Sequence, residues 1–121
     1  MIKGLRTAIY PVADLAAAKA WYGSVFGVAP YFDQPFYVGF SVGGFELGLL
    51  PDGTPGATGS MVYWGVDDLD AEVARILALG ATLHGAIQDV GGGIRTAELA
   101  DPDGNLLCLI DNPHFDPSAV R

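Results

Sequence analysis

The stretch VADLAAAKAWY (residues 12–22) carries the signals that begin a helix, and a related stretch occurs once more in the chain. The second copy is VDDLDAEVARILALGA (residues 66–81). In both copies an aspartate, Asp14 or Asp68, precedes an apolar periodicity. An aspartate in this N-cap position accepts a hydrogen bond from an otherwise unpaired N–H of the first helical turn. Both copies are therefore expected to begin helices, and the repeat indicates two related structural units.

Apolar residues follow each cap at the spacing of a helix face, and each helix is expected to end at a glycine, Gly27 or Gly80. The expected faces are Leu15, Ala18, Tyr22, Val25 and Phe26 on the first helix and Leu69, Val73, Ile76 and Leu77 on the second. We assign these residues to the hydrophobic core and give them no chemical role.

β-Strand patterns surround the helices, in the order strand, helix and three strands, twice over. The strands are expected at residues 7–12, 31–32, 36–42 and 45–50, and again at 61–66, 82–90, 94–100 and 105–111. The segment DPDG (residues 101–104) suits a type I turn and leads into the last strand.

The sequence therefore predicts an α+β fold of two βαβββ modules within a single domain, residues 1–121. Module one is expected at about 5–50, a linker at 51–60, module two at about 61–112 and a tail at 113–121. Neither half is expected to bury its sheet alone, so the modules should pair within one chain or between two chains.

The composition restricts the class of protein and of partner. The net charge is −8, from 14 acidic against 6 basic residues, which makes a nucleic acid an unfavourable partner. The single cysteine excludes an internal disulfide, and residues 1–5 lack the features of a secretory signal. No apolar run approaches the ~20 residues of a membrane span. We therefore expect a cytoplasmic protein with neither a membrane nor a nucleic-acid partner.

The two V-x-D-L helix openings, together with DPDGNLLCLID (residues 101–111), resemble the vicinal oxygen chelate superfamily over about residues 5–113. This superfamily includes glyoxalase I, extradiol dioxygenases, and fosfomycin- and bleomycin-resistance proteins. The resemblance implies a glyoxalase-like cleft between paired βαβββ modules, and a homodimer. In the metal enzymes of the family, His, Gln or Glu ligands lie on the first and last strands of each module.

The positions that the resemblance assigns to these metal ligands are Thr7, Glu46, Met61 and Cys108. Only Glu46 is a good ligand for a hard divalent ion, which needs three or four anionic or imidazole ligands. The two histidines, His84 and His114, fall outside these positions. We therefore expect no metal and no cofactor.

Without a metal, the cleft would be lined mainly by apolar and aromatic side chains, as a small-molecule pocket requires. The residues expected to contact a ligand are Thr7, Ile9, Tyr37, Phe40, Glu46, Met61, Tyr63 and Cys108. Two roles stay open for Glu46. It is either a carboxylate hydrogen-bonded to Thr7 or to a tyrosine hydroxyl, or a group that meets a ligand donor or acts as a general base. Cys108 is expected to be a buried, unreactive thiol.

The leading hypothesis is a metal-free, homodimeric small-molecule binding protein of the bleomycin-resistance type. It would sequester an aromatic or cationic molecule, with antibiotics among the candidates. One alternative is a metal-dependent lyase, isomerase or dioxygenase of the same superfamily that uses displaced ligands. Another is a metal-independent enzyme with Glu46 as its base.

Overall fold

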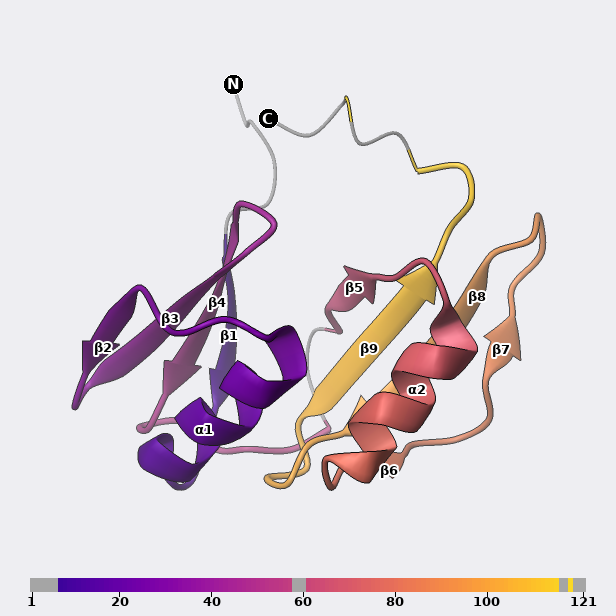
Figure 1. The fold of residues 1–121 in the computed structure, drawn as a ribbon. Helices are drawn as coiled ribbons and strands as arrows, with labels where there is room; N and C mark the ends of the chain where they lie inside the picture. Colours follow the sequence, from indigo (N-terminus) through magenta and orange to yellow (C-terminus); the bar gives the residue numbers. More distant parts are fainter. Residues whose placement is uncertain (1–6, 58–60, 116–117, 119–121) are drawn as a thin grey trace. The chain divides into compact units, whose positions relative to one another are not determined.

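The chain divides into two compact units, one formed by Leu5–Gly56 and the other mainly by Ala57–Arg121. The structure, a computed structural model, describes residues 7–57, 61–115 and 118. Each unit consists of one helix and one β-sheet (Figure 1). The strand–helix–strand order repeats as the sequence predicts, and the fold is a mixed α+β fold of the βαβββ type.

The first unit has a four-stranded sheet in the order β1-β4-β3-β2. Its elements are β1 (Thr7–Pro11), α1 (Leu15–Phe26), β2 (Phe32–Gln34), β3 (Tyr37–Val42) and β4 (Phe45–Leu50). β1 pairs with β4 in parallel, and the other pairs are antiparallel. Because α1 covers one face of this sheet, the opposite face is left for other contacts (Figure 1).

The caps of α1 are those expected from the sequence. The Asp14 side chain accepts a hydrogen bond of 3.1 Å from the Ala17 backbone N–H, and Gly27 ends the helix with a φ of 68°. A left-handed φ favours glycine, which has no Cβ to clash with the backbone. The buried helix residues Ala18, Tyr22 and Val25 lie among the core residues of the unit. The strand residues of this core are Ala8, Tyr10, Val38, Phe40, Leu47 and Leu49.

The second unit has the sheet order β5-β9-β8-β6, with β7 also pairing with β8. Its elements are β5 (Tyr63–Gly65), α2 (Leu69–Ala78), β6 (Thr82–Leu83), β7 (Gln88–Asp89), β8 (Arg95–Ala100) and β9 (Leu106–Asp111). The Asp68 side chain caps α2 by accepting from the Ala71 backbone N–H at 3.1 Å. Leu69, Val73 and Ile76 are buried as expected.

Two expectations for the second unit were wrong. The predicted strand 82–90 is interrupted and forms the two short strands β6 and β7. Gly85 lies between them with a φ of 87°, a backbone conformation outside the extended region of a strand. Leu77 was expected on the buried helix face, but its exposed fraction is 37%. It lies at the solvent margin of that face, next to the buried Ile76.

The DPDG turn forms as predicted and joins β8 to β9. The Gly104 backbone N–H donates to the Asp101 carbonyl at 2.9 Å, and Gly104 has a φ of 84°. The Asp101 side chain accepts from the backbone N–H groups of Asp103 and Asn105, both at 2.9 Å. Because Asp101 and Asn105 are buried, these bonds stabilise the turn that sets the β8–β9 register.

Within the described ranges, neither helix has the length and apolar character that crossing a lipid bilayer requires.

Candidate functional site

The face of the first sheet opposite α1 presents two neighbouring rows of residues. In one row Thr7, Glu46 and Ser41 lie opposite one another on β1, β4 and β3. In the next row Ile9, Gly48, Gly39 and Phe32 cross all four strands. Residues that are paired across a sheet point to the same side, and so do residues two positions apart on one strand. The two rows therefore share one face.

Glu46 is the chemical centre of this face. Three hydroxyl groups donate to its carboxylate: Thr7 to Oε2 at 2.7 Å, Tyr37 to Oε2 at 3.0 Å, and Tyr31 to Oε1. We call these four residues the Glu46 cluster. The structure shows the hydrogen bonds expected for Glu46, with Thr7 and two tyrosine hydroxyls as donors.

The hydrogen bonds favour the ionised form of Glu46 and the protonated forms of Tyr31 and Tyr37. Donation from Tyr31, then from Thr7 and Tyr37, lowers the pKa of Glu46 against an opposing effect of desolvation. The bond to Glu46 raises the pKa of Tyr31, and burial followed by the bond to Glu46 raises that of Tyr37. Hydrogen bonds to a charged form favour that form, so Glu46 is an ionised acceptor at neutral pH.

Two strand glycines make room for the tyrosine rings of the cluster. A Cβ added at Gly39 would lie 3.3 Å from Cε1 of Tyr31 and 3.0 Å from Oε1 of Glu46. A Cβ added at Gly48 would lie 2.9 Å from Cε1 of Tyr37 and closer still to its hydroxyl oxygen. A glycine inside a strand often marks such a close approach. The glycine pair therefore forms a floor that the two tyrosine side chains cover.

The predicted ligand contacts in the first unit divide between the two faces of the sheet. Thr7, Ile9 and Glu46 lie on the face with the glycine floor, and Tyr37 reaches it through its hydroxyl. Phe40 does not, which corrects its place in the predicted site. Its exposed fraction is 0%, because its ring is directed to the α1 side, where it lies near Gly23.

Tyr31 was not among the predicted ligand contacts, although it falls in the predicted strand 31–32. In the structure it precedes β2, and its hydroxyl donates to Glu46. The sequence signal that could have found it is the strand glycine Gly39, because a glycine inside a strand often marks the close approach of another group.

In the second unit, Tyr63, Cys108 and Glu98 lie opposite one another on β5, β9 and β8. Cys108 is fully buried, and burial followed by the nearby charge of Glu98 raises the pKa of its thiol to about 11. Burial is also the first cause that raises the pKa of Tyr63. Glu98 was not among the predicted site residues, although its register places it beside two that were. Met61 lies before β5, with an exposed fraction of 42%.

The strand registers show that Glu46 and Cys108 do not occupy equivalent positions in the two modules. Val12 donates to the Leu50 carbonyl at 3.0 Å, and the matching Val66 donates to the Ile110 carbonyl at 2.9 Å. Cys108 lies two residues before Ile110, and Gly48 lies two residues before Leu50, so Cys108 corresponds to Gly48. Glu46 lies four residues before Leu50 and therefore corresponds to Leu106. The last-strand ligand positions predicted from the resemblance, Glu46 and Cys108, therefore differ by two residues in register between the modules.

Among the side chains of residues 7–57, 61–115 and 118, no three or more His, Cys, Asp or Glu residues gather as ligands for an ion. The ring Nε2 of His114 lies 2.7 Å from the Gly92 carbonyl, to which it donates, and His84 is exposed. Within either unit, the described residues therefore do not bring together a ligand set for a divalent cation.

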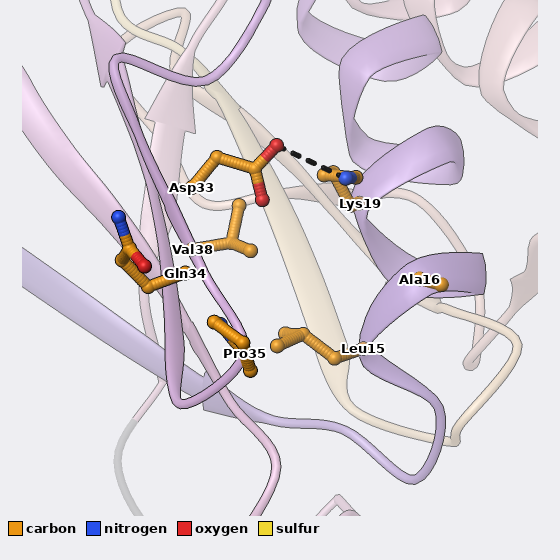
Figure 2. A pocket seen from close by; sticks show the side chains of 7 residues that line it. All are labelled: Leu15, Ala16, Lys19, Asp33, Gln34, Pro35 and Val38. Atoms are coloured by element: carbon orange, nitrogen blue, oxygen red, sulfur yellow. Dashed lines mark hydrogen bonds and ion pairs between the residues drawn. The ribbon is translucent and has the colours of Figure 1, made fainter.

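A pocket of roughly 390 Å³ lies in the first unit, between α1 and the β2–β3 hairpin. It is lined by Leu15, Ala16, Lys19, Asp33, Gln34, Pro35 and Val38. Figure 2 shows Lys19 reaching across it to Asp33, with a Nζ–Oδ2 distance of 3.0 Å. Because the two charges of this pocket neutralise each other, it offers a ligand no unpaired charge.

Comparison with known proteins relates nearly the whole chain to one group. The family model described as "Glyoxalase/Bleomycin resistance protein/Dioxygenase superfamily" matches residues 4–109. No curated protein matched the chain.

Several solved structures have the same fold. A glyoxalase-related enzyme from Fulvimarina pelagi is 25% identical, covers 95% of this chain and 92% of its own, and has a TM-score of 0.74. The fosfomycin resistance protein FosX from Listeria monocytogenes is 22% identical, with coverages of 94% and 97% and a TM-score of 0.79. TioX from Micromonospora sp. ML1 is 22% identical, with coverages of 89% and 98% and a TM-score of 0.71.

Proposed function

The chain belongs to the glyoxalase/bleomycin resistance protein/dioxygenase superfamily, and from that premise we propose that it is a metal-independent small-molecule binding protein. Its ligand is aromatic or cationic, and it binds on the sheet face that carries the Glu46 cluster. Antibiotics are the first ligands to test, because two of the resistance groups in this superfamily are named for them.

The observation that carries this proposal is the state of Glu46. Its carboxylate is ionised and accepts three hydroxyl donors, among them that of the exposed Tyr31, and the ring of Tyr37, another donor, contacts Phe32 with ring centroids 6.1 Å apart. An anionic acceptor bordered by aromatic rings attracts a cation both by its charge and through the faces of the rings. Flat apolar ligands gain further contact area from the same rings.

The chemistry of the four family ligand positions supports metal independence. Thr7 is a neutral hydroxyl that already donates to Glu46, and Met61 is a thioether. Cys108 is a fully buried thiol, so it lacks the anionic oxygen that a hard divalent ion takes. In register, the first-module counterpart of Cys108 is Gly48, which has no side chain.

The lowered pKa of Glu46 favours binding over general-base catalysis. A general base works best when its pKa lies near the operating pH, and known enzymes raise the pKa of a glutamate for that task. Here the three hydroxyl donors lower the pKa of Glu46 instead. We therefore assign Glu46 to ligand recognition.

Isothermal titration calorimetry of chelator-treated protein against a panel of aromatic antibiotics and flavins tests this function. We expect saturable binding of at least one ligand, unchanged when Zn²⁺, Mn²⁺, Ni²⁺ or Fe²⁺ is added. Elemental analysis of protein purified without a metal-affinity resin provides an independent control. One tightly held metal ion per chain, or no binding across the panel, would contradict the proposal.

We propose further that the protein is a cytoplasmic homodimer. Light scattering coupled to size-exclusion chromatography is expected to give twice the chain mass of 12.6 kDa. A monomeric mass with ligand binding intact would overturn the dimer and leave the ligand site standing.

A further inference from the structure

The Tyr31 side chain is held on the Glu46 face by few interactions. Its exposed fraction is 63%, and its hydrogen bond is to Oε1 of Glu46. Its backbone is anchored separately, because the Tyr31 N–H donates to the Gly39 carbonyl at 3.0 Å. The ring can therefore turn away about its side-chain torsions without disturbing the β2–β3 pairing.

The two carboxylate oxygens of Glu46 are used differently. Oε2 accepts from Thr7 and Tyr37, whereas Oε1 accepts from Tyr31. When Tyr31 leaves, Glu46 keeps two donors and its ionised state, and Oε1 becomes available to a new donor. A charged N–H donor forms a stronger hydrogen bond with a carboxylate than a neutral phenol does.

The surface beneath Tyr31 is flat. Its ring lies over Gly39, which presents no side chain. This place is bordered by Phe32, which is paired with Gly39 and has an exposed fraction of 38%, and by the Tyr37 side chain, which lies over the neighbouring Gly48. A planar ring fits such a surface, with apolar contacts at both ends.

We propose that Tyr31 is a displaceable cover and that the site takes a planar aromatic ring bearing a protonated amine or amidinium. The cationic N–H replaces the Tyr31 hydroxyl on Oε1 of Glu46, and the ligand ring replaces the Tyr31 ring over Gly39. This inference rests on the proposed binding function and defines its ligand class.

Benzamidine and its neutral counterpart benzamide are the probes that test this inference, titrated while the backbone NMR signals of Gly39 and Gly48 are followed. Benzamidine is expected to bind at least tenfold more tightly than benzamide. Glu46→Gln should remove that advantage and leave benzamide binding unchanged, since a hydrogen bond between charged groups accounts for about tenfold or more in affinity.

Tyr31→Phe distinguishes a cover from a ligand contact. The variant keeps a ring but loses the hydroxyl that competes for Oε1. Because that bond is to a charged carboxylate but is largely exposed to water, benzamidine is expected to bind about fivefold more tightly. Ser41→Ala is the matched control. Ser41 lies opposite Glu46 in register, and the structure shows no hydrogen bond between these two described side chains, so the affinity should not change.

Three results would overturn this inference. The first is weaker or equal benzamidine binding by Tyr31→Phe, and the second is equal binding of benzamidine and benzamide. The third is failure of both probes while a ligand from the antibiotic panel binds, which refutes the ligand class and leaves the proposed function intact. If nothing in the panel binds either, the proposed function itself has failed.

Discussion

Replacing Gly48 by alanine tests whether the glycine floor positions the Glu46 cluster. The new Cβ would lie 2.9 Å from Cε1 of Tyr37, so the Tyr37 side chain must move and lose its 3.0 Å bond to Oε2 of Glu46. Gly48 is not among the glycines with a positive φ, so the backbone can accept alanine without strain. The change should therefore act on the cluster and leave the fold in place.

The effect of this substitution on stability is small because two terms oppose each other. A hydrogen bond to a charged group contributes ~1.5–3 kcal/mol, and we reduce this to about 1 kcal/mol because the bond is partly exposed and Thr7 still donates to the same oxygen. Replacing a strand glycine by alanine stabilises the folded state by roughly 0.5–1 kcal/mol, because alanine loses less backbone entropy on folding. The free energy of unfolding in urea should therefore stay within about 1 kcal/mol of the native value.

The discriminating measurement is the pKa of Glu46, followed by NMR through its side-chain carboxyl carbon. With one donor lost, this pKa should rise from its lowered native value towards its ordinary value of 4.5. Gly65→Ala is the control, since a Cβ there meets no atom within 4 Å. An unchanged Glu46 pKa in Gly48→Ala, or a loss of more than ~3 kcal/mol in stability, would refute the reasoning.

The remaining predictions concern charge, the turn, the thiol and the core. Glu46 has a folded pKa below its ordinary 4.5, so it stabilises the protein above that pH, and this contribution is lost as the pH falls through the folded value. Urea unfolding of Glu46→Gln at neutral pH and at about pH 3 should show a smaller pH dependence than the native protein, and an equal one would contradict the assignment. Asp101→Ala should cost ~1–3 kcal/mol, because two backbone N–H groups lose their acceptor, and Asp101→Asn should cost less; equal losses would count against the turn. Cys108, with a thiol pKa of about 11, should resist a thiol-reactive disulfide in mildly alkaline buffer until the protein is unfolded in urea, and fast labelling of the native protein would show that it is accessible. Phe40→Ala should lower the free energy of unfolding by ~3–5 kcal/mol, and a much smaller loss would mean that its ring is not part of the core.

Features governed by a few neighbouring residues were predicted well from the sequence. Asp14 and Asp68 accept hydrogen bonds from residues three positions later, and Asp101 accepts from residues two and four positions later. Such bonds need only local chain geometry, so their sequence signals are reliable. The strand predicted at 82–90 failed because one glycine, Gly85, adopts a conformation that alternation of apolar residues does not reveal.

The sheet face on which a side chain lies, and the register between strands, were harder to predict. Phe40 was assigned to the ligand site, but its neighbour Gly39 lies on that face, and adjacent strand residues point to opposite sides. Glu46 and Cys108 were treated as matching positions, and the backbone bonds of Val12 and Val66 show an offset of two residues. Both errors arise because one sequence specifies the period of a strand more clearly than its phase.

By itself the sequence determined the two-module α+β fold, the positions of the helices and the DPDG turn, because these depend on periodicity and on residues close together in the chain. Only the tertiary structure decided which side chains meet at Glu46. Its hydroxyl partners lie 39, 15 and 9 positions away in the chain. They converge because β1 pairs in parallel with β4 and because Gly39 and Gly48 leave space for two tyrosine side chains. Contacts of that kind depend on strand register and on space across a sheet, and no short stretch of sequence contains them.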